Sequence, residues 1–357
     1  MMERDLTKHY DYDALVREEK EHYAEIEITD DLREGGAHAS DCWTYYWQHV
    51  QRTLDTSPFA DFAGALNARF GALGRPLRIL SLGSGYCGHE LKLARALTCD
   101  YRITCTDINP ALFGPAQEIV DREQFAVTFA VEDINFITIE KGQYDLIFAH
   151  AAIHHVINLE RLFEQLLLGL SPNGIFHLVD VVGQNRKLLW DANERMANAL
   201  LRAIPKEITR GLRLNAPVED EGMEGIRQED TMPVLRATFE PIFEHRHGAF
   251  MRFICTNARL AKRLDPRDAT ARRYLDFLID CDDSLVARGI LEPLEVWGVY
   301  RPRKDGIAAL DALIASDVLG SHKRGATERN LVVAVWHELD RRARRALRGM
   351  RRRVLGR

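Results

Sequence analysis

A short apolar run that ends in three glycines constrains this chain more than any other feature. Residues 80–90 read LSLGSGYCGHE, with glycines at positions 83, 85 and 88. The residues from 77 to 82 predict a buried strand, and those from 88 to 97 have apolar side chains at helical spacing. A strand, a glycine turn and a helix amino terminus expose backbone N–H groups and let a ligand approach closely. The turn therefore predicts a site for a nucleotide-containing cofactor.

The next two predicted strands each end in a carboxylate. Asp107 closes the strand in 101–110, about 20 residues after the glycines, where a carboxylate can accept hydrogen bonds from both ribose hydroxyls of an adenosine. Asp133 follows the strand in 125–135, where an acid can accept from the adenine amino group and Ile134 can pack on the ring. These residues indicate an adenosine cofactor, which NAD and S-adenosylmethionine both satisfy.

The residues that follow favour one of these two cofactors. Residues 144–156 (YDLIFAHAAIHHV) predict a fourth strand with its loop, and residues 166–180 (LLLGLSPNGIFHLVD) predict a turn into a fifth strand. Together with the glycine turn and the two acids, they resemble class I S-adenosylmethionine-dependent methyltransferases over residues 76–183. The resemblance implies that S-adenosyl-L-methionine is the cofactor and that the chain is a methyltransferase.

The resemblance also implies which residues bind the cofactor. They lie in the glycine turn and at the ends of strands two to four: Gly83, Ser84, Gly85, Tyr86, Asp107, Ile108, Asp133, Ile134, Asn135 and His150. The turn departs from the usual G-x-G-x-G of the family, because Tyr86 and Cys87 displace the third glycine to position 88.

The fold implied by the resemblance is α/β, with a mixed, doubly wound sheet of seven strands in residues 71–304. The last two strands are predicted in 243–255 and 294–303, where apolar runs follow a long helical stretch. In the family these two strands form an antiparallel edge, so the sheet is mixed.

Three segments lie outside this sheet. Residues 1–70 predict an N-terminal helical lid, in which the aromatic helix 41–54 either packs on the core or covers the cofactor. Residues 184–240 are longer than a normal crossover and predict a helical insertion that caps the substrate. Residues 305–357 predict a helical tail, basic towards its end.

The basic tail suggests a partner. Residues 332–357 place apolar side chains along one helical stripe and arginines elsewhere, a pattern typical of a helix on an anionic membrane surface, bound to nucleic acid or packed on its own domain. Nucleic acid is the least favoured partner, because no aromatic residues alternate with the basic ones. The acidic N-terminus is not a signal peptide, so we expect a cytoplasmic protein with peripheral contact to the inner membrane surface.

The loop after the fourth strand holds the candidate catalytic residues. Ligands bind at the carboxyl ends of the strands in such sheets, and His154 and His155 follow the fourth strand. A histidine can act as a general base near neutral pH, which a hydroxyl acceptor requires. His154 is the first candidate, whereas His155 is either catalytic or structural. Asp180, at the end of strand five, either orients the substrate or caps the turn.

The absence of certain motifs limits the classes of methyl acceptor that the sequence allows. The [DN]-P-P-[YF] loop of amino-methylating enzymes and the cysteine of cytosine C5 enzymes are both absent, which favours O-methylation of a hydroxyl on a small molecule or glycan. No acids cluster after strand four and the six cysteines lack metal-finger spacing, so we expect no metal site. Two alternatives are an NAD-dependent oxidoreductase, which would need a proton donor such as Y-x-x-x-K, and a non-catalytic scaffold that binds S-adenosylmethionine.

Overall fold

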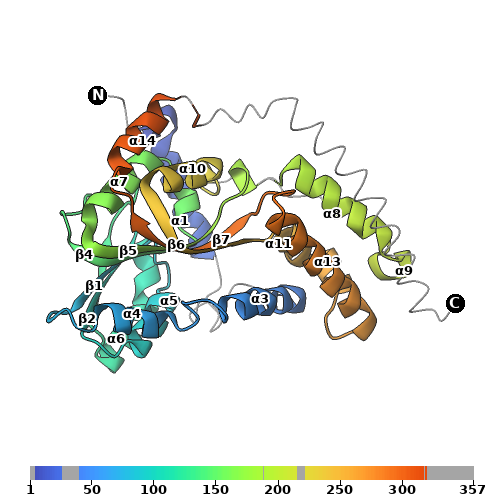
Figure 1. Ribbon diagram of the computed structural model, residues 1–357, viewed down its shortest axis with the longest axis horizontal. Helices are drawn as coiled ribbons and strands as arrows, with labels where there is room; N and C mark the ends of the chain where they lie inside the picture. Colours follow the sequence, from blue (N-terminus) through green and yellow to red (C-terminus); the bar gives the residue numbers. More distant parts are fainter. Residues whose placement is uncertain (1–4, 26–39, 188, 215–221, 317, 320–357) are drawn as a thin grey trace.

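A seven-stranded sheet forms the centre of the computed structural model, which describes residues 5–25, 40–187, 189–214, 222–316 and 318–319 (Figure 1). The strand order is β3-β2-β1-β4-β5-β7-β6. The strands are β1 (Leu77–Leu82), β2 (Tyr101–Asp107), β3 (Val127–Val131), β4 (Tyr144–His150), β5 (Leu170–Val181), β6 (Phe239–His247) and β7 (Glu295–Pro302). The first five are parallel and β7 runs antiparallel to both of its neighbours, so the mixed, doubly wound sheet predicted from the sequence is confirmed.

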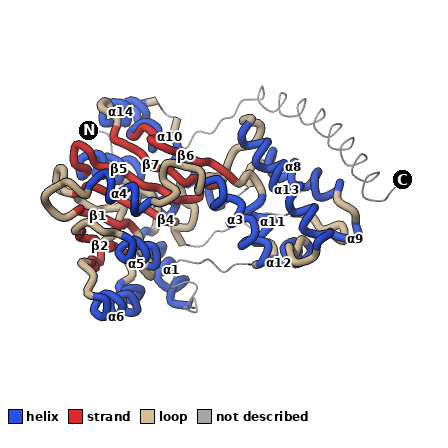
Figure 2. The backbone as a smooth tube through the Cα atoms, turned by 60° about the horizontal axis from the view of Figure 1, so that its bottom comes forward, coloured by secondary structure: helices blue, strands red, loops and turns tan. Residues whose placement is uncertain are grey.

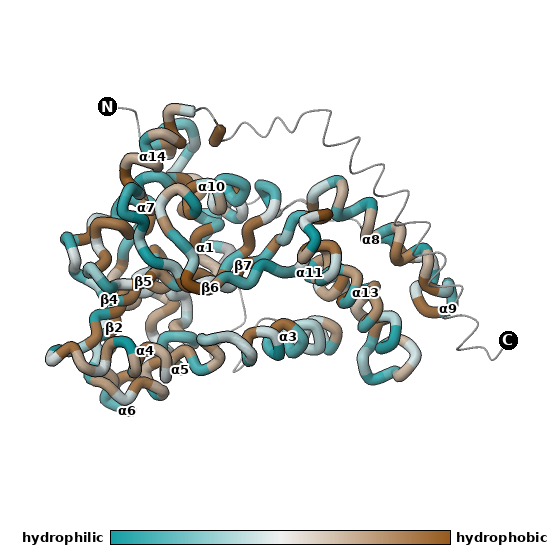
Figure 3. The backbone as a smooth tube through the Cα atoms, viewed as in Figure 1, coloured by the Kyte–Doolittle hydropathy of each residue, from teal (hydrophilic) through white to brown (hydrophobic). Residues whose placement is uncertain are grey.

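Helices cover both faces of the sheet. One layer contains α4 (Phe62–Phe70), α5 (Gly88–Ala96) and α6 (Gly114–Glu123), and the other contains α7 (Leu159–Gly169), α10 (Gln228–Thr238) and α14 (Gly306–Ala315). The apolar residues of the central strands lie between these layers, as the brown segments in Figure 3 show. Because both faces are covered, β1 and β4 are nearly continuous apolar runs rather than alternating ones.

A separate group of helices lies beside one end of the sheet (Figure 2). It consists of α3 (Asp41–Leu54), α8 (Asp191–Ala203), α9 (Lys206–Thr209), α11 (Met251–Thr256), α12 (Ala258–Arg263) and α13 (Ala269–Ala287), which share one apolar core. The aromatic helix 41–54 therefore packs into this helical body, with Tyr46 fully buried. The segment 184–240, predicted as one insertion, is divided: α8 and α9 join the helical body, whereas α10 packs beside α7.

The prediction of a strand in 243–255 is wrong for the second half of this range. Strand β6 ends at His247, and Met251–Thr256 form helix α11. Gly248 ends the strand with φ of +72°, and the backbone N–H groups of Ala249, Phe250 and Met251 then donate to the buried Asp282 carboxylate. A short apolar run fits a buried strand and a buried helix equally well, so its sequence pattern did not distinguish them.

The N-terminal and C-terminal segments are only partly described. Helix α1 (Tyr12–Glu25) lies over the carboxyl ends of the strands, and α14 packs on α10 and α7. The basic helix predicted in 332–357 lies outside the described residues, and its contact with a membrane remains a prediction. Among the residues that are described, no helix combines the length and the apolar character needed to cross a membrane.

A buried carboxylate joins the amino ends of three strands. Asp145 in β4 accepts two hydrogen bonds from the Arg75 guanidinium at 2.6 and 2.8 Å, one from the Arg78 backbone N–H and one from the Ser171 hydroxyl. Burial alone would raise the pKa of Asp145, but these donors outweigh it and hold the pKa well below its usual range. The carboxylate thus connects the loop before β1 to β4 and β5.

Replacing Asp145 with alanine is expected to lower the free energy of unfolding by about 2 kcal/mol, because the Ser171 hydroxyl and the Arg78 N–H lose a buried acceptor. The pKa of Asp145 is lower in the folded protein than in the unfolded protein, where it is about 4. The ionised carboxylate therefore stabilises the fold above that pH, and its contribution is lost as the pH falls below it. Urea unfolding at pH 7 and at about pH 2 measures both effects, because the contribution begins to be lost only below about pH 4. The exposed Asp121→Ala is the control, with an expected change below about 0.5 kcal/mol. Equal stabilities of the two variants would contradict this role.

Candidate active site

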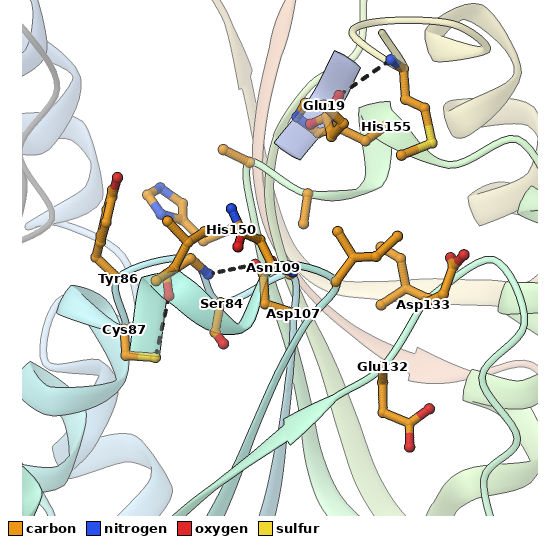
Figure 4. Close-up of a pocket in the computed structure, with 18 of the residues that line it drawn as sticks. Glu19, Ser84, Tyr86, Cys87, Asp107, Asn109, Glu132, Asp133, His150 and His155 are labelled. Carbon is orange, nitrogen blue, oxygen red and sulfur yellow. Dashed lines mark hydrogen bonds and ion pairs between the residues drawn. The ribbon is translucent and has the colours of Figure 1, made fainter. Parts of the chain in front are cut away.

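A cavity of about 310 Å³ lies at the carboxyl ends of β1, β2 and β4 (Figure 4). All ten cofactor residues predicted from the sequence line it: Gly83, Ser84, Gly85, Tyr86, Asp107, Ile108, Asp133, Ile134, Asn135 and His150. In Figure 4, Tyr86 and Asp133 lie at opposite ends of the cavity with Asp107 between them. A volume of this order is typical of a site for one small organic ligand.

Further lining residues were not among the sequence predictions. His89 comes from α5, Glu19 and Lys20 come from α1, and Met223 comes from the segment before α10. The position of His89, one residue after the glycine turn, is a signal that sequence reasoning could have used. Glu19, Lys20 and Met223 carry no local signal, because they reach the cavity from segments remote from the strand ends.

The glycine turn forms one side of the cavity and packs closely against the loop after β4. Gly83 and Gly85 have φ of +57° and +51°, and a Cβ at Gly83 would lie 2.7 Å from the Ala152 Cβ. Only glycine fits at position 83, because any side chain would clash with the loop after β4. The Ser84 N–H donates to the Thr106 carbonyl, so the turn is also fixed to β2.

The Asp107 carboxylate has acceptor capacity left for a ligand. Its Oδ2 accepts from the Gly85 N–H at 2.9 Å and its Oδ1 from the Asn109 N–H at 2.8 Å. Each oxygen can accept a second hydrogen bond, which matches the two hydroxyls of a ribose. Burial raises the pKa of Asp107, and the two N–H donors oppose that shift.

Helix α1 is held over the cavity by three polar contacts. At one end, the Tyr12 hydroxyl donates to Asp133 Oδ2 at 2.6 Å. At the other end, Glu19 Oε1 lies 2.9 Å from His155 Nδ1, and Glu19 Oε2 accepts from the Met223 N–H (Figure 4). Within the N-terminal segment predicted as a lid, α1 therefore lines the cavity, whereas α3 belongs to the helical body.

The two histidines in the loop after β4 have different surroundings. His155 lines the cavity, whereas His154 lies behind the cavity wall with 4% of its side chain exposed. His154 Nδ1 is 2.5 Å from Asp180 Oδ1, and Asp180 Oδ2 also accepts from the backbone N–H groups of the loop at 2.7 and 3.2 Å. The two catalytic candidates are thus neighbours, but His155 is the one that meets the cofactor cavity.

His150 lies at the other side of the cavity, against His89. Their ring centroids are 3.7 Å apart in an edge-on arrangement. Burial lowers the pKa of His89 to about 4 and lowers that of His150 well below its ordinary value. Both rings are therefore neutral near pH 7. They can form hydrogen bonds with a ligand in the cavity without adding positive charge.

One group of side chains has the composition of a metal site, although none was expected from the sequence. Within the described part of the chain, His154, His155 and Glu224 bring their potential ligand atoms within 4.8 Å of one another. Glu224 precedes α10, about 70 residues from the two histidines, so no local sequence pattern indicates this arrangement.

Comparison with known proteins identifies the domain. Residues 79–174 match the family model of a methyltransferase domain, which spans β1 to the start of β5. The chain carries a class I S-adenosylmethionine-dependent methyltransferase domain. The cofactor of this methyltransferase is S-adenosyl-L-methionine, as the sequence predicted, and the NAD alternative is not supported.

Curated relatives are similar to part of this methyltransferase. The chain is 32% identical over 114 residues to a highly reducing polyketide synthase of Cordyceps militaris, and 30% identical over 112 residues to the 3-methylorcinaldehyde synthase of Talaromyces stipitatus. These matches cover 29% and 30% of this chain but only 4% of either relative. Among solved structures, a putative sarcosine dimethylglycine methyltransferase from Galdieria sulphuraria is 18% identical with a TM-score of 0.39, covering 68% of this chain and 84% of that one.

The cavity has features that fit S-adenosylmethionine. Asp107 would accept from the ribose hydroxyls, Asp133 and Ile134 would meet the adenine, and Gly83 and Gly85 would lie under the methionine half. The acceptor capacity left on Asp107 and the open space at Gly85, where a Cβ would meet nothing within 4 Å, are the two observations that carry this fit.

Replacing Asp107 with alanine is expected to weaken S-adenosylhomocysteine binding about a hundredfold. The change removes the acceptor for both ribose hydroxyls and also releases the Gly85 N–H that it fixes. Calorimetric titration measures the affinity, and Asp100→Ala, at an exposed residue immediately before β2, is the control with unchanged affinity. An Asp107→Ala protein that binds as tightly as the wild type would remove Asp107 from the cofactor site.

Proposed function

We propose that this methyltransferase methylates a hydroxyl group on a small molecule or glycan. The observation that carries the proposal is the hydrogen-bonded pair of His154 and Asp180 at the carboxyl ends of β4 and β5. A hydroxyl is a poor nucleophile until it loses its proton, so its methylation needs a base beside the donor methyl group. An imidazole held by a buried carboxylate supplies such a base.

His154 and Asp180 have different roles in proton transfer. S-adenosylmethionine, when bound, supplies an electrophilic methyl group on a sulfonium. His154 Nε2 would take the proton of the acceptor hydroxyl, so that the acceptor oxygen could receive the methyl group and S-adenosylhomocysteine would leave. Asp180 keeps the other imidazole proton on Nδ1 and stabilises the imidazolium that results.

Access to the base depends on Glu224. The His154 Nε2 faces Glu224 Oε1 at 3.3 Å, so an acceptor reaches this nitrogen only when the Glu224 side chain turns away. His155, which lines the cavity and lies against Glu19, is placed to orient the acceptor instead. His154 is therefore proposed to act as the base in the complex with cofactor and acceptor, after the Glu224 carboxylate has moved away from its Nε2.

A second candidate acceptor is an acidic carbon. The curated relatives quoted above include a polyketide synthase and a synthase named for a product with an added methyl group, 3-methylorcinaldehyde. A carbon between two carbonyl groups also loses a proton before it accepts a methyl group, so the same imidazole could serve it. The two candidates differ in the atom that receives the methyl group, which is directly measurable.

The test is transfer of isotope-labelled methyl from S-adenosylmethionine to two panels of acceptors. One panel contains phenols, alcohols and sugar hydroxyls, and the other contains β-dicarbonyl compounds and their thioesters. A product with an O–CH₃ carbon resonance supports the proposal, whereas a C–CH₃ resonance supports the second candidate. Binding of S-adenosylhomocysteine without transfer to any acceptor would favour a scaffold.

Replacing His154 with alanine is expected to lower turnover at least about tenfold while S-adenosylhomocysteine affinity stays nearly unchanged, because His154 is outside the cofactor cavity. Asp180→Asn is expected to lower turnover as well and to shift the pH profile, since an amide cannot stabilise the imidazolium. His49→Ala is the matched control, because His49 also pairs with a carboxylate, Asp283, but at a remote surface. Unchanged turnover of His154→Ala on a true acceptor would exclude this base.

A further inference from the structure

We propose that His154, His155 and Glu224 form a binding site for one divalent transition-metal ion of the Zn²⁺ type. Two imidazoles and a carboxylate are a ligand set that suits such ions. The proposal goes beyond methyl transfer, because it concerns an ion that the methyltransferase reaction itself does not require.

The spacing of the potential ligand atoms fits a bound ion. His154 Nε2 lies 3.3 Å from Glu224 Oε1, and His155 Nε2 lies 3.2 Å from Glu224 Oε2. A tetrahedral ion with bonds of about 2.0 Å holds its ligand atoms about 3.3 Å apart. Charge-assisted hydrogen bonds between nitrogen and oxygen are shorter, at about 2.8 Å. Both separations are longer than such a hydrogen bond, and one potential ligand atom from each of the three residues lies within 4.8 Å of the others, so the three side chains can converge on one ion.

The second nitrogen of each imidazole is already occupied by a carboxylate. His154 Nδ1 is 2.5 Å from Asp180 Oδ1, and His155 Nδ1 is 2.9 Å from Glu19 Oε1. In metal sites, a carboxylate on the far nitrogen fixes the tautomer so that the other nitrogen presents its lone pair to the ion. Both histidines have this arrangement, and both direct Nε2 toward the same Glu224 carboxylate.

The backbone around the three ligands is held in place. The histidines lie in a short 3₁₀ turn, Ile153–His155, and the N–H groups of Ala152 and Ile153 donate to Asp180. On the opposite side, Arg186 Nη1 donates to the Gly222 and Glu224 carbonyls, at 2.9 and 3.4 Å. A preformed backbone lowers the cost of ordering the ligands when an ion binds.

Three protein ligands leave a coordination position of the ion open. Catalytic and exchangeable zinc sites share this property, whereas structural sites usually have four protein ligands. An ion bound to His154 Nε2 also takes the lone pair that the proposed base uses. Metal binding and proton acceptance by His154 therefore exclude each other.

The test is metal binding by the reduced, full-length protein without any acceptor present. Competition with a chromophoric chelator measures Zn²⁺ affinity and stoichiometry, and Co²⁺ substitution reports the ligand type. We expect one ion per chain and a Co²⁺ spectrum without a thiolate charge-transfer band. Glu224→Ala and His155→Ala are expected to weaken Zn²⁺ binding at least about tenfold each, with S-adenosylhomocysteine binding to show that Glu224→Ala remains folded.

His49→Ala is the control for adventitious binding, because His49 Nε2 also lies beside a carboxylate, 2.6 Å from Asp283. Its Zn²⁺ affinity should equal that of the wild type. Absence of stoichiometric binding, equal affinity of Glu224→Ala and wild type, or a thiolate band from the cysteines would each overturn the proposal. Because no acceptor is used, a failure here leaves the proposed methyl transfer untouched, and a failure of methyl transfer leaves this result standing.

Discussion

The arrangement of the site depends on one buried carboxylate, Asp180. Its two oxygens accept from the N–H groups of Ala152 and Ile153, from its neighbour Val181 and from the His154 ring. These bonds hold the loop after β4 against the end of β5. The same loop supplies Ala152, whose Cβ would clash with any side chain at Gly83, and both histidines at the reacting end. One carboxylate thus fixes the floor of the cofactor cavity and the orientation of the proposed base. Burial would raise the pKa of Asp180, but the His154 ring and the N–H donors outweigh it, so it keeps its charge.

The rest of the cavity is completed by segments that are distant in sequence. Tyr12 reaches across to Asp133, and Glu19 contacts both His155 and the Met223 backbone. Helix α1 is therefore held by the cofactor site on one side and by the segment before α10 on the other. When S-adenosylmethionine binds, the adenine amino group and the Tyr12 hydroxyl would both use Asp133 as an acceptor. Because a carboxylate has about four acceptor positions, it can serve both, so α1 can remain in place over a bound cofactor.

The sequence correctly predicted the features that depend on residues close together in the chain. Apolar runs followed by Gly83, Asp107 and Asp133 identified strand ends, and parallel strands bring such ends to one edge of the sheet. The boundary between β6 and α11 was missed, since it depends on Gly248 and on a cap from Asp282, 34 residues later. Which of two adjacent histidines faces the cavity depends on the bond of one of them to Asp180. No local pattern contains Glu19 or Glu224, because their contacts join segments about 70 to 205 residues apart.

The charges around the reacting end favour a cation there. Asp180, Glu19 and Glu224 bring three carboxylates to two imidazoles within one partly buried cluster. With neutral imidazoles this cluster would carry three negative charges, and burying uncompensated charge is costly. A divalent ion compensates two of these charges. The sulfonium of S-adenosylmethionine would add one positive charge in the adjacent cavity. A bound cofactor would therefore lower the need for a metal ion, so cofactor and Zn²⁺ are expected to weaken each other's binding by the same factor.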